Sequence, residues 1–141
     1  MTDVAATNEM ATTPSLSRGG TWNIAVWVIQ AVLALQFAGG GVLKLTGDPA
    51  MVKMFADIGV GQWFRYGIGS LEIAAAIGLL IPRLSGAAAM GVVALMTGAI
   101  ITSVVILEAG PWLALVVLLL AATVARSRWP QTAALIDQRR G

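Results

Sequence analysis

Residues 84–107 contain no charged side chain. A run of about 20 predominantly apolar residues is long enough to cross the hydrocarbon core of a bilayer as a helix. Only 11% of the 141-residue chain is charged and 57% is hydrophobic, whereas soluble domains carry roughly 25% charged residues. Because so few polar side chains are available to cover a soluble fold, the sequence predicts an integral, multi-pass membrane protein.

Four segments have the length and composition of membrane-spanning helices. The second contains Glu72, and the fourth reaches full length only if Arg126 and Arg128 extend to the headgroups. The four predicted spans cover about residues 22–44, 63–81, 84–107 and 111–129 of a membrane domain at 21–129. Because the turns between the last three spans are short, neighbouring helices must be antiparallel. The predicted fold class is therefore an all-α, four-helix antiparallel bundle in the membrane.

The distribution of positive charge predicts the orientation. Residues 1–20 and 130–141 are expected to be cytoplasmic tails, the first disordered, and the loop at 45–62 to face outward and form a short interfacial helix. Lys44, Lys53 and Arg65 lie on the outward side. Six arginines lie on the other side: Arg18, Arg83, Arg126, Arg128, Arg139 and Arg140. The excess of positive charge places both termini in the cytoplasm. The expected location of the protein is a bacterial inner membrane or a plasma membrane. We interpret the C-terminal arginines as topology determinants that contact anionic lipid, without a catalytic role.

The composition also excludes several chemistries. The chain has no Cys and no His, so disulfides, thiolate nucleophiles and the usual haem and zinc ligands are excluded. We therefore expect no metal site and no covalent cofactor. A net charge of +2 gives no reason to expect nucleic-acid binding. Any electrons that the protein handles must come from another protein or from a bound cofactor.

Glu72 is the polar residue that most needs an explanation. It lies about 13 Å from the outer end of the second span at 1.5 Å per residue. A carboxylate at this depth is costly unless it is protonated, paired or exposed to a polar cavity, and by default it indicates a functional site. The alternative is a buried carboxylate that ties helices together by hydrogen bonds.

Other polar residues are predicted at a similar depth. Gln36 and Thr97 share the layer of Glu72, and Thr102 and Ser103 lie closer to the outer surface. Lys44 is the preferred counter-charge for Glu72, because Arg65 can extend to the headgroups instead. These residues predict an outward-opening polar pocket, with Glu72 and Lys44 as the catalytic candidates and Gln36, Gly40, Glu72, Thr97, Thr102 and Ser103 as the ligand-binding candidates.

Two patterns of small residues bear on how the helices pack. Gly39, Gly40 and Gly41 allow a local kink or give a ligand access to the backbone; the alternative role is a close helix crossing. Small residues at helical spacing predict a seam between the second and third spans. They are Ser70, Ala74 and Gly78 on one side, and Ala87, Gly91, Ala94, Gly98 and Thr102 on the other.

The first three predicted spans resemble a known family, and its motifs lie in the first two. Phe37, the glycines at 40 and 41, and the Lys44–Leu45 step resemble the Phe-x-x-x-Gly-x-x-Lys-Leu region of the DoxX-like family of small four-helix membrane proteins. Gly69-x-x-Glu72, followed by the Gly78-Leu79-Leu80 run, resembles its Gly-x-x-Glu…Gly-Leu-Leu helix. The resemblance covers about residues 22–107.

The resemblance implies a limited set of functions. The family is similar to the small membrane subunit of thiosulfate:quinone oxidoreductase, and some members resemble partners of soluble redox enzymes. By this analogy Glu72 is the intramembrane acid and Lys44 its basic neighbour. The family often has a His in the third helix, where this chain has Thr102, Ser103 and Val104. This departure weakens a proton-transfer role.

The sequence supports more than one function. The first is an accessory membrane subunit that binds a quinone or a similar lipophilic molecule and docks a redox partner. The second is a non-redox membrane enzyme that uses Glu72 as a general acid or base on a lipophilic substrate. A carrier has little support without an inverted repeat, and a structural scaffold is a further alternative. We expect a homo-oligomer or a heteromer; whether the chain is an enzyme is left open.

Overall fold

The computed structural model of the chain describes residues 18–107 and 110–141 and consists of helices and their connections. The helices are α1 (Arg18–Thr46), α2 (Pro49–Ile58), α3 (Gln62–Leu80), α4 (Ser85–Val105) and α5 (Trp112–Gln138). The all-α class is confirmed for the described residues. The structure has five helices: four long ones, and the short helix α2 in the loop after α1, where a short helix was expected. Of the predicted N-terminal tail, residues 1–17 lie outside the described part, and the rest belongs to α1.

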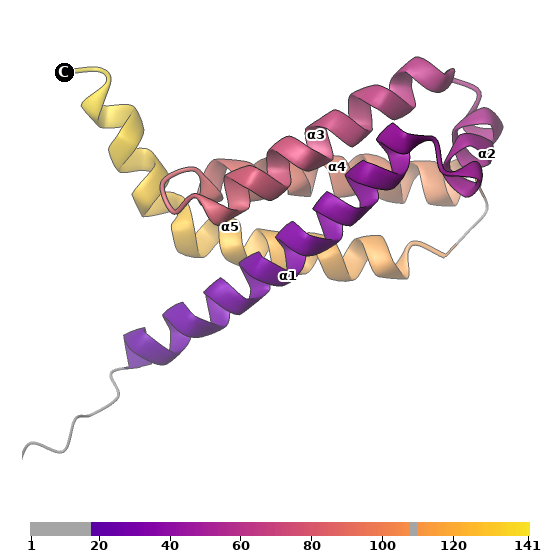
Figure 1. Cartoon of the computed structure of the whole chain (residues 1–141). Helices are drawn as coiled ribbons and strands as arrows, with labels where there is room; N and C mark the ends of the chain where they lie inside the picture. Colours follow the sequence, from indigo (N-terminus) through magenta and orange to yellow (C-terminus); the bar gives the residue numbers. More distant parts are fainter. Residues whose placement is uncertain (1–17, 108–109) are drawn as a thin grey trace, which may run out of the picture.

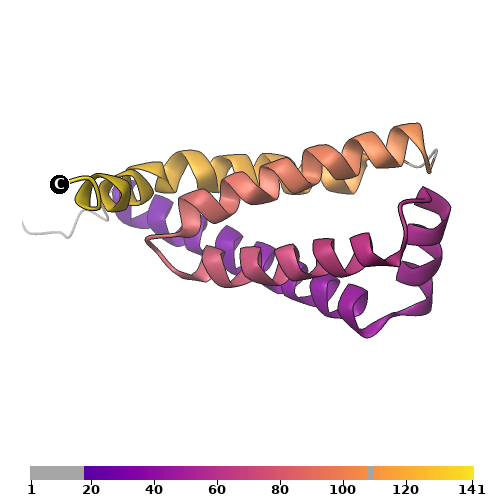
Figure 2. The same cartoon turned by 90° about the horizontal axis from the view of Figure 1, so that it is seen from above.

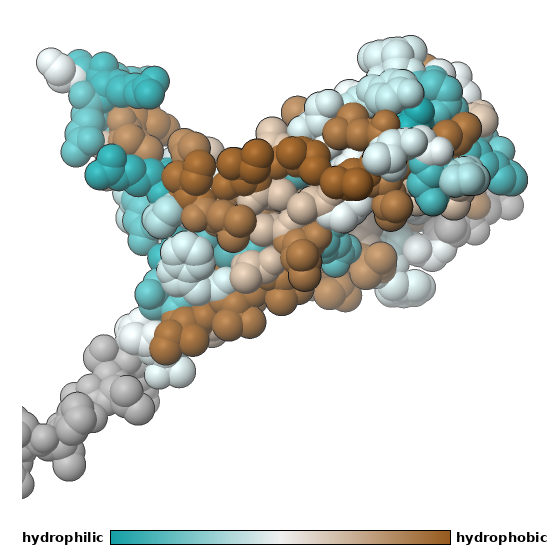
Figure 3. Space-filling model, viewed as in Figure 1, coloured by the Kyte–Doolittle hydropathy of each residue, from teal (hydrophilic) through white to brown (hydrophobic). Residues whose placement is uncertain are grey.

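Three helices are long and apolar enough to cross a membrane. These segments are Gly19–Thr46, Ser85–Val105 and Trp112–Gln138. The remaining long helix, α3, has 19 residues and carries Arg65 and Glu72. Figure 3 shows an apolar surface along the middle of the molecule, with hydrophilic residues gathered near α2 and at the C-terminal end. This distribution is the one expected of a protein whose middle faces lipid.

The four long helices form two antiparallel pairs. α1 packs along α3, and α4 packs along α5. The pairs approach each other near the α3–α4 turn and diverge toward α2, which lies across the open end (Figures 1 and 2). Both ends of the described chain lie at the closed end of the molecule (Figure 1). The arrangement therefore has a closed end, near the termini, and an open end, near α2.

Glycines let α1 and α3 approach closely. A Cβ atom on Gly41 would lie 2.9 Å from the carbonyl oxygen of Gly69, and one on Gly69 would lie 3.0 Å from Cβ of Lys44. These distances are shorter than ordinary van der Waals contact, so any side chain here would push the helices apart. Of the two roles considered for the glycine run, the close crossing is the one that Gly41 performs.

The predicted small-residue seam between α3 and α4 closes only near the turn. A Cβ atom on Gly78 would lie 2.8 Å from Cβ of Ala88. Farther along α4, a Cβ atom on Gly91 or Gly98 would have no neighbour within 4 Å. Gly91 and Gly98 therefore do not pack against α3.

Local signals explain why α2 forms. The Asp48 side chain caps its start by accepting hydrogen bonds from the amides of Ala50 (3.1 Å) and Met51 (3.3 Å), and Pro49 occupies the first helical position. Gly59, with φ +80°, ends the helix in the left-handed conformation that glycine adopts without strain. The buried Phe55 then packs edge-to-face on Phe64 of α3, with ring centroids 6.0 Å apart.

The core combines apolar packing with a few buried polar groups. At the closed end, the Thr132 hydroxyl donates to the Arg83 carbonyl oxygen (3.1 Å), and α5 continues past Trp129 with Pro130 inside it. The predicted C-terminal tail is thus helical up to Gln138. The largest fully buried side chains are Leu33, Leu79, Gln30, Val26, Val92, Val124 and Ser85.

Candidate functional site

The site is centred on a buried ion pair between α1 and α3. Lys44 Nζ lies 3.0 Å from Glu72 Oε2, and the two side chains are 13% and 9% exposed. Lys44 belongs to the last turn of α1 and Glu72 to the middle of α3. The antiparallel packing of these helices brings the two charges together across 28 positions of sequence. The expected pairing of Glu72 with Lys44 is therefore present.

Arg65 does not extend to the headgroups as expected. Its side chain is buried, with 3% of the residue exposed, and Nε donates to Gln62 Oε1 (2.7 Å). Nη1 donates to the carbonyl oxygen of Lys44. Carbonyls in the last turn of a helix have no partner within the helix, so the end of α1 offers this guanidinium a better partner than the solvent would. Arg65 thereby fixes the backbone of the residue that pairs with Glu72.

Two further residues of α1 border the ion pair. A Cβ atom on Gly40 would lie 3.3 Å from Glu72 Oε2 and 3.7 Å from Lys44 Nζ, so a glycine leaves the pair its space. Gln36, one turn earlier, lines a small recess of about 130 Å³ beside the pair. The other residues of this recess are Phe37, Gly40, Lys44, Glu72 and Met96. The recess therefore brings together Gln36, Gly40, Lys44 and Glu72 as the sequence predicts.

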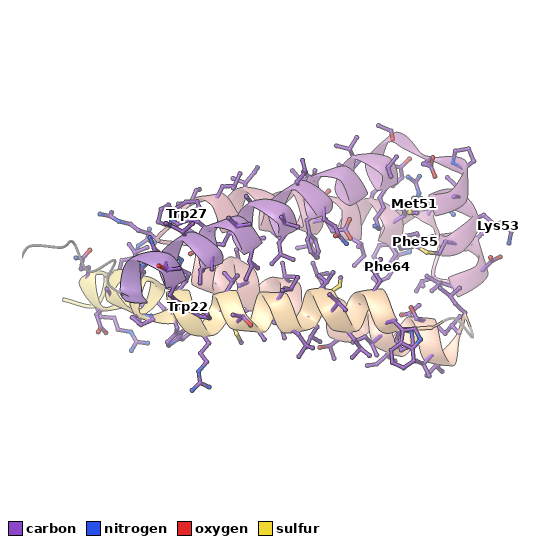
Figure 4. The ribbon with its side chains drawn as sticks, turned by 90° about the horizontal axis from the view of Figure 1, so that it is seen from below. Trp22, Trp27, Met51, Lys53, Phe55 and Phe64 are labelled. Carbon is purple, nitrogen blue, oxygen red and sulfur yellow. The ribbon has the colours of Figure 1, made fainter. Side chains whose placement is uncertain are left out.

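A much larger apolar cleft opens beside the recess, between the two helix pairs. Its volume is about 890 Å³, which lies in the range of binding sites for small molecules. Gln36, Lys44 and Glu72 line both spaces. Most other residues of its wall are apolar, among them Met51, Met54, Phe55, Ile58, Ile68, Leu71, Leu95, Leu107, Leu113 and Val117. Figure 4 shows Met51, Phe55 and Phe64 at the α2 end of the gap between the pairs, and Lys53 pointing away from it.

The predicted hydroxyl groups separate into two sets. Thr102 and Ser103 line the cleft. The Thr97 hydroxyl instead donates to the Val93 carbonyl oxygen (2.8 Å), and the residue is exposed and absent from the cleft wall. Five residues of helix separate Thr97 from Thr102, which corresponds to a rotation of about 140°. Thr97 was predicted at the depth of Glu72, but it lies on a face of α4 that does not line the cleft.

The sequence does not predict the apolar part of the cleft or the polar groups of the closed end. Gly91, Ala94 and Gly98 fit the pattern of a helix seam, but they line the cleft. Gln30 is fully buried and Arg128 is 6% exposed. An amide in the middle of a predicted span was a signal for Gln30, because a polar group in lipid needs a partner. Arg128 had no such signal among the neighbouring arginines.

The fold and the cleft define a class: a helical membrane protein with a deep apolar cleft whose wall carries a buried ion pair. In a comparison with family models, the model described as the DoxX-like family matches residues 28–125. The match covers more than half of the chain and extends from α1 into α5, so the chain belongs to the DoxX-like family and is a multi-pass integral membrane protein. Searches of curated proteins and of solved structures find no match.

Proposed function

We propose that this protein is an accessory membrane subunit that binds a quinone or a similar lipophilic molecule. The observation that carries the proposal is the apolar cleft of about 890 Å³ whose wall includes Lys44, Glu72 and Gln36. A site of this composition suits a molecule with a long apolar part and a small polar ring. Apolar pockets with a few converging polar groups are the usual form of small-molecule sites.

The polar groups supply the donors that such a ring requires. A quinone carbonyl accepts hydrogen bonds, and an ammonium has three N–H donors. In the described part of the chain Lys44 Nζ donates only to Glu72 Oε2, so two N–H groups remain for a ligand. The Gln36 amide lies on the same recess. The apolar tail would lie along the wall formed by α2 and α4.

The remaining parts of the proposal concern topology and partners. All four long helices cross the plasma membrane, with both termini in the cytoplasm and the cleft opening outward; the charge distribution supports this orientation. The docked partner is a redox protein, because a chain without Cys and His lacks the usual ligands of electron-carrying metals. The resemblance to a quinone oxidoreductase subunit supports such a partner, within a homo-oligomer or a heteromer.

Quinone binding can be tested with the full chain in lipid nanodiscs. We expect the wild type to retain a short-chain quinone in excess of empty nanodiscs. Lys44→Met should weaken binding about tenfold or more, because a hydrogen bond to a charged group contributes roughly 1.5–3 kcal/mol. Lys53→Met is the matched control, since Lys53 is an exposed lysine paired with Asp57 on α2, and should bind like the wild type. Equal binding by the Lys44→Met variant, or none by the wild type, would refute the proposal.

A second candidate function is supported by the same carboxylate. Glu72 lies on the wall of a cleft that a lipophilic substrate could occupy, which is the position required of a general acid or base. A non-redox enzyme would turn over its substrate with a bell-shaped pH profile that disappears in Glu72→Gln. Quinone retention without any turnover would favour the binding subunit, and neither activity would favour a scaffold.

A further inference from the structure

A second polar site lies at the closed end, and its buried polar residues, Gln30 and Arg128, do not line the cleft. Arg128 of α5 is buried, with 6% of the residue exposed. Its Nε donates to Gln30 Oε1 of α1 (2.8 Å), and Gln30 Nε2 donates to the carbonyl oxygen of Leu79 in α3 (2.6 Å). With the Gln131 amide in the orientation that satisfies its neighbours, Nη1 of Arg128 donates to Gln131 (3.2 Å), and Gln131 donates to the Pro82 carbonyl (3.1 Å).

The partners of Arg128 leave its charge uncompensated. All of them are neutral, and Nη2 is buried without a hydrogen-bond partner among the described residues. Burial of a charge without an opposite charge is strongly unfavourable. Within residues 18–107 and 110–141, Asp137 is the only side-chain carboxylate at this end of the molecule; it is exposed and nine positions away on the same helix, about 14 Å along the axis.

The surroundings place the guanidinium at the level of the lipid headgroups. The uncharged part of α5 ends at Ala125, immediately before Arg126 and Arg128. Trp27 lies over the Arg128 guanidinium, 5.5 Å from its carbon to the ring centroid, and is 36% exposed. Figure 4 shows Trp27 toward the end of the molecule opposite α2. Tryptophan is enriched at membrane–water interfaces, and here it covers a cation that lacks an anion.

We infer that Arg128, flanked by Trp27 and held by Gln30, binds the phosphate group of an anionic phospholipid in the leaflet on the side of the termini. A phosphate oxygen would take the free Nη2 donor, and a guanidinium binds phosphate with well-defined geometry. Because Nη2 is buried, the exposed Trp27 indole beside the guanidinium would have to rotate to let a phosphate oxygen reach it. Arg83, Arg126, Arg139 and Arg140 lie near the same end and attract the headgroup without contacting it specifically.

The test compares the full chain with two matched variants of α5. Arg128→Met removes the buried charge, and Arg126→Met removes an exposed charge from the same turn. Native mass spectrometry from nanodiscs with equal phosphatidylglycerol and phosphatidylcholine would count the lipids retained. We expect several-fold enrichment of phosphatidylglycerol on the wild type and on Arg126→Met, and no enrichment on Arg128→Met. Equal loss in both variants, or no enrichment on the wild type, would overturn the inference.

Thermal unfolding provides a second measurement that does not depend on lipid counting. A ligand that binds the folded state raises the unfolding temperature. Phosphatidylglycerol should raise that of the wild type and of Arg126→Met by several degrees, but not that of Arg128→Met, which should fold because it removes an uncompensated charge. Inorganic phosphate at millimolar concentration should have little effect. If it protects the wild type while the lipid does not, the ligand is a free anion and the lipid assignment is wrong.

Discussion

The three successive glycines of α1 have different surroundings. A Cβ atom on Gly39 would meet nothing within 4 Å, one on Gly40 would approach Glu72, and one on Gly41 would lie 2.9 Å from both the Gly69 carbonyl oxygen and the Ile73 side chain. Each glycine therefore has its own consequence for stability, although they are adjacent in the sequence.

The difference between Gly39 and Gly41 can be measured with two alanine substitutions. Gly41→Ala should destabilise the protein by about 1–3 kcal/mol, because the added methyl group forces closely packed backbones apart. Gly39→Ala should stabilise it by about 0.5–1 kcal/mol, because alanine favours the helix and the site is open. Thermal unfolding in the same detergent would compare the two. Changes of the same sign would contradict the proposed role of Gly41 in the helix crossing.

Single residues of the site differ in how well the sequence predicts them. The pairing of Lys44 with Glu72 follows from charge and position, because a carboxylate inside a span needs a partner and Lys44 is a cation at the outer end of the neighbouring span. The burial of Arg65 does not follow, since its long side chain reaches the headgroups and the end of α1 equally well. The side of α4 on which Thr97 lies depends on the rotation of this helix about its axis. Because α4 has small residues on several sides, the sequence leaves this rotation undetermined.

At the scale of elements, α2 is a short helix that lies across the open end of the molecule. Met51, Met54, Phe55 and Ile58 contribute to the cleft wall, and the Gln62 amide donates to the Val52 carbonyl oxygen (3.1 Å). Gly47 and Gly59, with φ near +80°, flank the helix. The apolar residues of the loop predicted a helix here, but not its position across the gap between the pairs.

Removal of the α2 cap should loosen this helix alone. Asp48→Ala removes two hydrogen bonds to the first turn, and loss of an N-cap costs about 1 kcal/mol. Amide hydrogen exchange in α2 should become about fivefold faster, while α1 and α3 should be unaffected. Asp57→Ala is the control, because it breaks only an exposed ion pair with Lys53, which contributes little. Equal acceleration by both variants, or acceleration throughout the chain, would argue against local control of α2.

At the scale of the whole molecule, the sequence predicts the long helices better than their arrangement. Apolar length fixes where each helix lies along the chain, since a bilayer requires about 20 apolar residues. The sequence does not predict that the two helix pairs diverge. Small residues such as Gly91, Ala94 and Gly98 are equally compatible with a tightly packed helix contact and with the wall of a cleft, which is where they lie. Gly78 makes the close contact that the pattern predicts, but with Ala88, which is next to the predicted Ala87.

The absence of Cys from the sequence allows a direct test of the orientation. Ala56→Cys on α2 and Gln138→Cys at the end of α5 each introduce a single, exposed thiol without changing any charge. A membrane-impermeant maleimide should label the first variant in intact bacterial cells and the second only after permeabilisation. Labelling of both variants in intact cells, or the reverse pattern, would contradict four crossings with cytoplasmic termini.

The two helix pairs meet at one end, near Gly78 and Ala88. Each pair can therefore rotate relative to the other about this contact. Helix α4 has 21 residues and is thus about 31 Å long. A change of about 5° in the angle between the pairs would displace its far end by about 3 Å, roughly the thickness of an aromatic ring. Small differences in packing at the closed end therefore produce larger differences in the separation of the two helix pairs at the open end, where a ligand would enter the cleft.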